Sequence, residues 1–380
     1  MQQAFSGLKV LDFTTTIAGP YCTRLLADLG ARVTKIESDD GDVMRSRPPL
    51  RAGASTTYGQ LNAGKRSVAL DLKSPKALAV IEALVRDADI LVENFRPGVM
   101  ARFKLDYARL AELNPRLIYC SISGYGQTGP SADQPAYAPT MHAASGFDRA
   151  NMAYQSVRTR PDYCGVFVAD VVAGTYAFGA ISAALHQRHA TGRGQHIDVS
   201  MLEAMLSLTL VELQGAQFEM PPPPKRPIFG PVETADGFIM LAVASERTFQ
   251  NLARVAGRAD WITDPRFERY LDRRTNWADL MDEVEVWSRT LDTERCLAAL
   301  AKGGVPASSY RTVAEALADP QIAHRGALAE VKDAGGTFKV LNAPFRMSAS
   351  ALRPGPAVSQ QGEDTAAVLA EAGFTADDLM

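Results

Sequence analysis

Residues 8–37, LKVLDFTTTIAGPYCTRLLADLGARVTKIE, combine two strand-like runs with a helical stretch between them. Residues 8–13 form a short run rich in β-formers, and a Gly-Pro pair then opens a helical stretch over residues 21–29. Gly30 suits the position just after a helix, where a left-handed conformation is needed. Residues 31–37 are typical of a second strand, so the stretch predicts a strand–helix–strand unit.

The same alternation continues along the first half of the chain. Residues 67–72, 90–93 and 117–123 are strand-like. Ser74 and Pro75 suit the N-cap and first positions of a helix that runs to Arg86. Strands that alternate with helices at this spacing form a mostly parallel sheet covered on both faces. We therefore expect the α/β class, with a large Rossmann-like domain.

The second half begins with a helical pattern over residues 170–190 and a strand over 195–201, followed by a long apolar helix. Four prolines at 221–224 then exclude a helix or a central strand and indicate a stiff extended linker. The sequence after them is typical of a smaller α+β domain, and residues 364–372 form a final amphipathic helix. We expect a large domain over residues 1–220, a linker and small domain over 221–330, and a C-terminal segment over 331–380 that returns to the large domain.

Composition narrows the class of protein. With 380 residues, 46% of them hydrophobic, two domains are expected. The formal net charge of −3 argues against a nucleic-acid binder, which would be strongly basic. The four cysteines are scattered and form no CxxC pair, so neither a metal site nor a disulfide framework is expected. With no pattern of a signal peptide or membrane span, we expect a cytoplasmic enzyme.

No single motif identifies the chemistry. The sequence lacks a P-loop, an HExxH, a GxSxG and a GxGxxG after the first strand. The turn at Gly19-Pro20 follows the first strand, and ligands bind at the carboxyl ends of strands in such sheets. A simple strand-to-helix turn explains the same two residues.

Six segments, in this order, resemble the class III CoA-transferases, or CaiB–BaiF family: LDFTTTIAGPYCTRLLADLGARVTKIE, GKRSVALDLKSP, VENFRPG, ISGYGQTGP, ADVVAG and TGRGQHIDVSMLEAML. Formyl-CoA transferase, carnitine CoA-transferase and α-methylacyl-CoA racemase belong to this family. The resemblance covers residues 7–205 and returns weakly in VPASSYRTVAEALADPQ. It implies acyl-CoA and free carboxylic acid substrates, coenzyme A as the carrier with no other cofactor or metal, and an interlocked homodimer.

The resemblance also implies that Asp170, in ADVVAG, is the nucleophile. Moving CoA between two acids without hydrolysis requires a nucleophile that keeps the acyl group activated. A carboxylate does so through mixed anhydrides and an aspartyl-CoA thioester. Asp170 opens the predicted helix, whose dipole favours its ionised form. A role only as a helix N-cap is the alternative.

Coenzyme A requires a pocket for an adenine, a pyrophosphate and a 3′-phosphate. Lysine and arginine suit the phosphates, and an aromatic ring can stack on adenine or line the thiol arm. Solvated surface side chains are the alternative for the two basic residues of the set. The residues that the resemblance implies for this pocket are Thr16, Ile17, Ala18, Leu70, Lys73, Asn94, Phe95 and Arg102, with Met201 packing near the thioester.

Three features depart from the family pattern. Ile17 and Ser38 stand where formyl-CoA transferase has glutamine and arginine, which argues against formyl-CoA chemistry with oxalate. Residues 227–231, PIFGP, do not form the glycine-rich shielding loop of that enzyme. Residues 148–161 bring three arginines ahead of Asp170. These suit bidentate pairing with the second carboxylate of a dicarboxylic acid, although a solvated loop fits equally well: Arg149, Arg158 and Arg160.

Two other functions remain open. The racemase branch removes and returns an α-proton with a histidine–aspartate pair. Tyr137 occupies the position of that histidine, as in transferases, so we expect transfer, with Tyr137 as a second catalytic residue. His142 is a possible substitute base, and a purely structural role, which is commoner for a lone histidine, is the alternative. A non-catalytic CoA-binding homologue is the other alternative, and retention of Asp170 argues against it.

Overall fold

The computed structural model describes residues 2–155, 159–161, 163–218 and 228–378. It divides into two compact units. The first comprises Met1–Asp148, Tyr163–Leu210 and Gln321–Met380, and the second comprises Arg149–Asp162 and Val211–Pro320. The chain thus leaves the first unit at residue 210 rather than 220 and returns at 321 rather than 331. Residues 149–162, expected in the large domain, group with the second unit.

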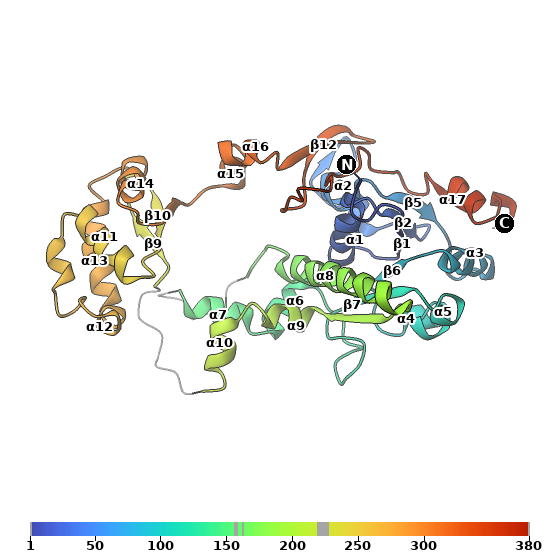
Figure 1. The fold of residues 1–380 in the computed structure, drawn as a ribbon, viewed down its shortest axis with the longest axis horizontal. Helices are drawn as coiled ribbons and strands as arrows, with labels where there is room; N and C mark the ends of the chain where they lie inside the picture. The colour runs from blue at the N-terminus through green and yellow to red at the C-terminus, as the bar shows by residue number, and fades with distance from the viewer. Residues whose placement is uncertain (1, 156–158, 162, 219–227, 379–380) are drawn as a thin grey trace. The chain divides into compact units, whose positions relative to one another are not determined.

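A six-stranded parallel sheet forms the centre of the first unit (Figure 1). Its order across the sheet is β5-β2-β1-β6-β7-β8, so the third, second, first, fourth, fifth and sixth sheet strands along the chain lie side by side. This is the order of doubly wound Rossmann-like sheets. It confirms the expected fold class. The strands are β1 (Lys9–Asp12), β2 (Arg32–Glu37), β5 (Arg66–Ala69), β6 (Ile90–Glu93), β7 (Ile118–Ser123) and β8 (His196–Ser200).

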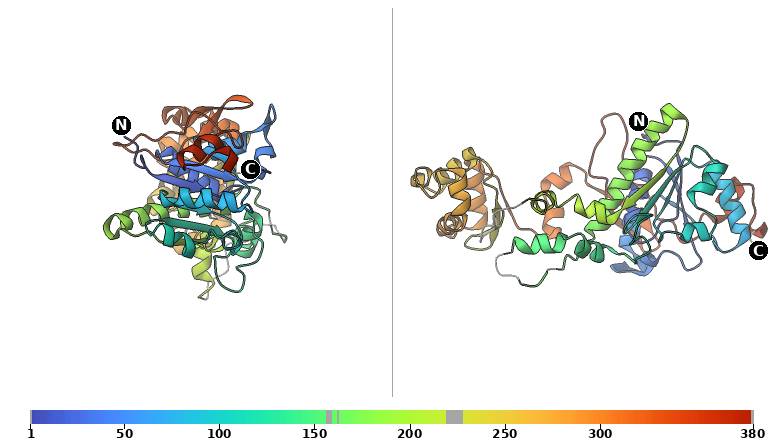
Figure 2. Two further views of the ribbon diagram at one scale, coloured as in Figure 1. Left: turned by 90° about the vertical axis from the view of Figure 1, so that its right-hand side faces the viewer. Right: turned by 90° about the horizontal axis from the view of Figure 1, so that it is seen from below.

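Helices cover both faces of this sheet (Figures 1 and 2). Successive side chains of a strand point to opposite faces, so Ile90 and Val92 join one core and Leu91 joins the other. Burial on both faces explains why the two central strands β6 (ILVE) and β7 (IYCSIS) are mostly apolar. One face carries α1 (Ala18–Asp28), α6 (Ala138–Ala144), α8 (Val168–Thr191) and α9 (Met201–Leu206). The other carries α3 (Pro75–Arg86), α4 (Val99–Arg102), α5 (Tyr107–Leu113) and α17 (Thr365–Glu371).

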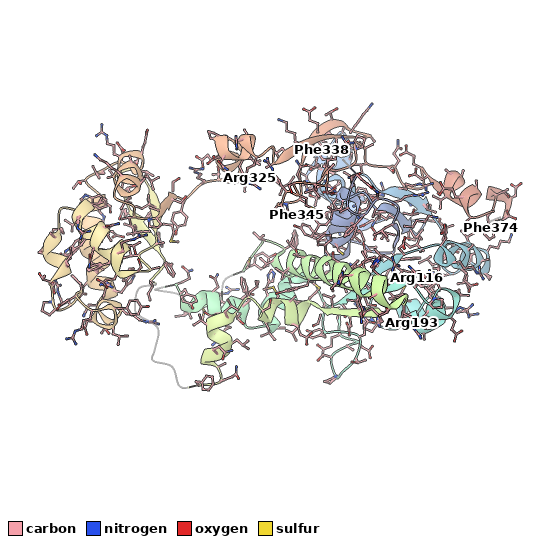
Figure 3. The ribbon with its side chains drawn as sticks, viewed as in Figure 1. Arg116, Arg193, Arg325, Phe338, Phe345 and Phe374 are labelled. Carbon is pink, nitrogen blue, oxygen red and sulfur yellow. The ribbon has the colours of Figure 1, made fainter. Side chains whose placement is uncertain are left out.

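Within the described part of the chain, α8 is the one helix long and apolar enough to cross a membrane. Core helices of soluble proteins share this property, and α8 packs against α1, α6, α9, β7 and β8. At its C-terminal end Gly192 has φ of 72°, and Arg116 donates a hydrogen bond to the Gly192 carbonyl at 3.2 Å. Figure 3 shows Arg116 and Arg193 at this end of the helix. Asp170 lies at the other end, in the first turn.

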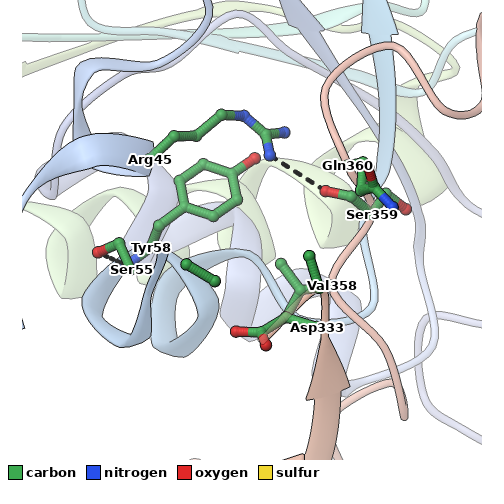
Figure 4. A pocket seen from close by; sticks show the side chains of 9 residues that line it. Arg45, Ser55, Tyr58, Asp333, Val358, Ser359 and Gln360 are labelled. Atoms are coloured by element: carbon green, nitrogen blue, oxygen red, sulfur yellow. Dashed lines mark hydrogen bonds between the residues drawn. The ribbon is translucent and has the colours of Figure 1, made fainter. Parts of the chain in front are cut away.

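The last 60 residues return to the first unit, and their hairpin packs beside a small N-terminal one. Val331 and Val340 share an apolar cluster with Tyr58 and Met44. Figure 4 shows the small pocket at this junction, where Arg45 lies 4.1 Å over the Tyr58 ring and donates to the Ser359 carbonyl at 3.2 Å. The elements here are η1 (Val43–Ser46), β3 (Leu50–Arg51), β4 (Ala54–Ser55), α2 (Thr56–Asn62), β12 (Leu328–Asp333) and β13 (Gly336–Leu341). Along the chain, α16 (Pro320–His324) precedes this hairpin and η3 (Ala376–Asp378) follows α17.

The second unit is a small α+β fold with its own core. Its antiparallel sheet has the order β11-β10-β9, and helices enclose the buried Phe249, Trp261 and Phe267. Its elements are α7 (Phe147–Ala153), α10 (Leu210–Gly215), β9 (Pro231–Glu233), β10 (Phe238–Leu241), α11 (Glu246–Val255), η2 (Ala259–Ile262), α12 (Tyr270–Thr275), α13 (Trp277–Ser288), α14 (Thr293–Lys302), β11 (Ala307–Ser309) and α15 (Val313–Leu317). Of these, α7 and α10 begin at the junctions with the first unit.

One predicted element differs. The long apolar helix expected after β8 is divided into α9 and α10. The hydroxyls of Ser207 and Thr209 donate to the carbonyls of Ala204 and Leu206, at 2.7 and 2.8 Å. These side chains compete for carbonyls that a continuing helix would use, which explains the break.

Candidate active site

The loop that joins β1 to α1 is held in a tight conformation. A Cβ at Gly19 would lie 2.3 Å from Cβ of Thr14, so this approach requires glycine. Thr16 has φ of 70°, a left-handed conformation that is costly for a β-branched residue. Strained residues of this kind persist only where the surroundings fix them, and they concentrate at functional sites.

Buried ion pairs lie next to the loop between β1 and α1. Asp12 at the end of β1 is fully buried and pairs with Lys65 at 3.0 Å. Lys35 donates to the carbonyl of Thr14 at 2.6 Å and pairs with Asp42 at 3.0 Å. Burial alone would raise the pKa of Asp12, but Lys65 and Lys35, with hydrogen bonds from two threonines, lower it to about 2. The carboxylate of Asp12 beneath this loop is therefore ionised at neutral pH.

Asp170 is brought to the same place by the close packing of α8 against α1. A Cβ at Gly174, one turn after Asp170, would lie 2.5 Å from the carbonyl oxygen of Ala18. Glycine thus permits the two helices to meet, and it brings the main chain of Ala18 close to the Asp170 carboxylate, whose pKa the Ala18 N–H lowers. Asp170 is 9% exposed. Burial raises its pKa to about 6, against the Ala18 N–H, which lowers it.

A cavity of about 240 Å³ lies at this position. It opens beyond the carboxyl ends of β1 and β6, neighbouring strands from which the chain continues in opposite directions across the sheet. Doubly wound sheets bind ligands at this switch point. The lining residues are Thr15, Thr16, Ala18, Asn94, Phe95, Arg96, Pro97, Ile122, Ser123, Gly124, Ala132, Gln134, Ala136, Tyr137, Asp170 and Met201.

The structure brings together seven of the residues singled out in the sequence. The cavity lining includes Thr16, Ala18, Asn94, Phe95, Tyr137, Asp170 and Met201. It does not include the other four candidates for CoA binding. Ile17 and Leu70 are buried in apolar clusters, 6% and 2% exposed, while Lys73 and Arg102 are exposed on the surface. The side chains of Ile17 and Leu70 contribute to packing because both lie at the boundary between a loop and the core.

The arginine-rich segment is described only in part. Arg149 lies on α7 and Arg160 in the following loop, and both are exposed members of the second unit. Arg158 lies outside the described residues. Recognition of a second carboxylate by these arginines stays a prediction.

Arg96 was missed in the sequence. It lies in VENFRPG, directly after Asn94 and Phe95, and lines the cavity. Its side chain is exposed, and the described residues offer it no ion-pair partner. A guanidinium in this state suits a phosphate or carboxylate of a ligand. The sequence could have indicated Arg96, because it lies closer to the end of a predicted strand than Arg102 does.

His142 does not line the cavity. Its Nε2 accepts a hydrogen bond from the main-chain N–H of Ala169 at 3.1 Å. A ring nitrogen that accepts an N–H has no free lone pair with which to remove an α-proton. The geometry therefore does not favour His142 as the substitute base of a racemase. In the described residues there is also no cluster of three side chains suited to hold a metal ion.

Comparison with known proteins agrees with this geometry. Residues 5–365 match the sequence model of the family described as CoA-transferase family III. The chain belongs to CoA-transferase family III. The resemblance drawn from the six sequence segments is confirmed, as is the expected class of enzyme.

Several members of family III are similar over their full length. The succinate–glutarate CoA-transferase of Agrobacterium fabrum is 35% identical, covering 96% of this chain and 95% of the relative. The acetyl-CoA:oxalate CoA-transferase of Acetobacter aceti is 37% identical, with 94% of each chain covered. The crystal structure of a CaiB/BaiF family protein from Brucella suis superposes with a TM-score of 0.83 at 32% identity, covering 98% of this chain and 100% of the other.

Proposed function

We propose that this family III member transfers coenzyme A from an acyl-CoA to a free carboxylic acid through a covalent thioester on Asp170, and that it acts on dicarboxylic acids. The observation that carries the proposal is the buried carboxylate of Asp170, which lines the cavity at the switch point of the sheet, close to the main chain of Ala18.

The proposed reaction has four steps, and each exchanges one acyl bond for another. The Asp170 carboxylate attacks the acyl-CoA carbonyl, releasing CoA thiolate and forming a mixed anhydride. The thiolate attacks the aspartyl carbonyl, which releases the first acid and leaves aspartyl-CoA. The acceptor carboxylate attacks this thioester, forming a second anhydride and releasing the thiolate. The thiolate then attacks the acceptor carbonyl, which gives the new acyl-CoA and restores Asp170. No proton or electron is gained or lost overall.

The surroundings of Asp170 support these steps. Burial raises its pKa to about 6, so the carboxylate is ionised at neutral pH yet more nucleophilic than a solvated one. The N–H of Ala18 is placed to stabilise negative charge on the aspartyl oxygen as tetrahedral intermediates form. Tyr137, 69% exposed, also lines the cavity and carries a hydroxyl that can donate a hydrogen bond. We propose that it hydrogen-bonds the acyl oxygen.

Dicarboxylic substrates are supported by the relatives. The names of two full-length relatives specify succinate with glutarate, and oxalate. A second carboxylate requires a cation near the cavity, and Arg96 meets this requirement among the lining residues. Arg149 and Arg160 are the candidates that the sequence suggests.

The experiment is an exchange assay with matched acids. Acetyl-CoA is mixed with succinate or with butyrate, and succinyl-CoA with glutarate or with valerate, with oxalate as a further diacid for both donors. New CoA thioesters are identified by mass spectrometry. We expect the diacids to react at least about tenfold faster, the scale of one charge-assisted pair. Equal rates with diacid and monoacid would contradict the proposed preference for dicarboxylic acids. Absence of any exchange would contradict the proposed CoA-transferase activity.

We also propose the interlocked homodimer that the family resemblance implies. Its mass in solution should be twice the 41.0 kDa of one chain. Light scattering after size exclusion measures this directly, and a monomeric mass at micromolar concentration would contradict it.

A further inference from the structure

The first turn of α8 lacks a cap from the residue that precedes it. Phe167 occupies the N-cap position, and its side chain makes no capping hydrogen bond. The first N–H groups of a helix have no helical partners, and each needs an acceptor from elsewhere. For Ala169 this acceptor is Nε2 of His142, at 3.1 Å, on the neighbouring helix α6. The acceptor comes from 27 residues earlier in the chain.

This hydrogen bond defines the protonation state of the imidazole. Because Nε2 accepts, a neutral ring carries its single proton on Nδ1. His142 is 1% exposed, and burial lowers its pKa, against the carboxylate of Asp148, which raises it. The helices that pack on α6 carry Asp170 and Glu203 in their first turns. In a protonated ring Nε2 also carries a hydrogen and cannot accept from the N–H of Ala169. The capping hydrogen bond therefore requires the neutral imidazole.

We propose that His142 is a positioning residue, which caps the first turn of α8 and thereby orients the carboxylate of Asp170 for acyl transfer. The inference rests on the proposed role of Asp170. Ala169 and Asp170 are consecutive, so a shift of the main chain at Ala169 moves the carboxylate relative to the N–H of Ala18. The start of α8 is thus held from two sides, by α6 through the hydrogen bond of His142 and by the close packing of α1 at Ala18.

Three substitutions separate this role from simple packing. His142→Gln can place an amide oxygen near the position of Nε2 and so can keep the acceptor. His142→Asn is shorter and reaches only the position of Nδ1. His142→Leu fills the space without any acceptor. His189→Gln, at an exposed histidine in the last turn of α8, is the control.

The first readout does not depend on activity. Hydrogen exchange measured by mass spectrometry on a peptide covering residues 166–172 reports the N–H of Ala169. We expect faster exchange in His142→Asn and His142→Leu, and wild-type exchange in His142→Gln and His189→Gln. Exchange over β6 and β7 should stay as in the wild type, which shows that the fold is retained.

The second readout is the transfer rate. We expect kcat to fall about 10- to 100-fold in the asparagine and leucine variants, with KM for acyl-CoA within about threefold, because a small misplacement of a reacting group mainly affects the chemical step. The glutamine variant should keep kcat within about threefold of the wild type.

Two results would overturn the inference. One is wild-type exchange at the start of α8 in the leucine variant. The other is equal kcat in the glutamine, asparagine and leucine variants. If the wild type itself moved no CoA, the proposed function would fail and the link to catalysis with it, whereas the exchange data would still decide whether His142 caps the helix.

Discussion

The side-chain amide of Asn94 forms two hydrogen bonds with the main chain of Thr15. Its Oδ1 accepts from the Thr15 N–H at 2.8 Å, and its Nδ2 donates to the Thr15 carbonyl, also at 2.8 Å. Asn94 directly follows β6, and Thr15 belongs to the loop after β1. The amide therefore joins the two strand ends between which the cavity opens.

Asn94→Leu should weaken the binding of coenzyme A by about 1–3 kcal/mol, because it leaves both main-chain groups of Thr15 without their partner. Asn94→Asp keeps the acceptor for the N–H but loses the donor, so its loss should be intermediate. Titration calorimetry with free CoA measures both. Wild-type affinity in the leucine variant would show that the loop does not depend on this pair.

Three basic side chains are candidates for binding the phosphates of coenzyme A. The resemblance implies Lys73 and Arg102, whereas the geometry adds Arg96. Replacement by alanine of a residue that contacts a phosphate should cost about 1–3 kcal/mol in CoA affinity. The loss should be smaller for dephospho-CoA if the contact is with the 3′-phosphate. Arg86→Ala, at an exposed arginine ending α3, is the control and should leave affinity unchanged.

The outcome separates the three side chains. If Arg96→Ala alone weakens binding of both ligands, the anionic part of CoA lies at the cavity mouth. If Arg96→Ala changes only the preference for diacids, Arg96 pairs with the substrate. Unchanged affinity in all three variants would place the phosphates elsewhere.

The rate should depend on pH through Asp170. The nucleophile must be ionised, and burial raises its pKa to about 6, so kcat/KM with acetyl-CoA should rise with pH up to about 6 and level off above it. Glu93 is the confounding group, since burial raises its pKa to about 7, against hydrogen bonds from Ser121 and the Phe95 N–H. Glu93→Gln should therefore leave the limb near pH 6 in place. Loss of that limb in this variant would assign the titration to Glu93 instead.

Much of the fold could be predicted because local signals and tertiary structure agree. The helix α3 runs from Pro75 to Arg86 as expected, and Ser74 caps it by accepting from the Lys76 N–H at 3.3 Å. Ile90–Glu93 is a strand over the predicted residues. In both cases caps and apolar spacing are properties of neighbouring residues.

The site was less predictable because it depends on contacts between distant residues. The hydrogen bond between His142 and Ala169 cannot be predicted from the residues that flank either one. Phe167, at the N-cap, is not a capping residue type and so gives no local indication of how the helix begins. Leu70 follows a strand, as a ligand contact would, yet its side chain points into the core. Position relative to a strand end predicts proximity to the cavity, but it does not predict which way a side chain turns.

Transfer and racemisation differ in the fate of the α-proton. The lone pair of His142 Nε2 is occupied by the Ala169 N–H, and Tyr137 offers a hydroxyl donor. We expect no uptake of deuterium from D₂O at the α-carbon of the acyl-CoA while CoA moves between acids, as followed by mass spectrometry. Rapid uptake that His142→Ala abolishes, without acid-dependent exchange of CoA, would indicate an isomerase.

The central claim is that Asp170 carries the acyl group and then coenzyme A. The direct measurement is to mix the enzyme with acyl-CoA, trap with hydroxylamine and locate the modified residue by peptide mass spectrometry, with Asp170→Ala as the control. We predict a hydroxamate on Asp170 alone and a loss of about 10³-fold or more in kcat for the variant. Modification at another residue, or near-normal turnover by Asp170→Ala, would contradict the account.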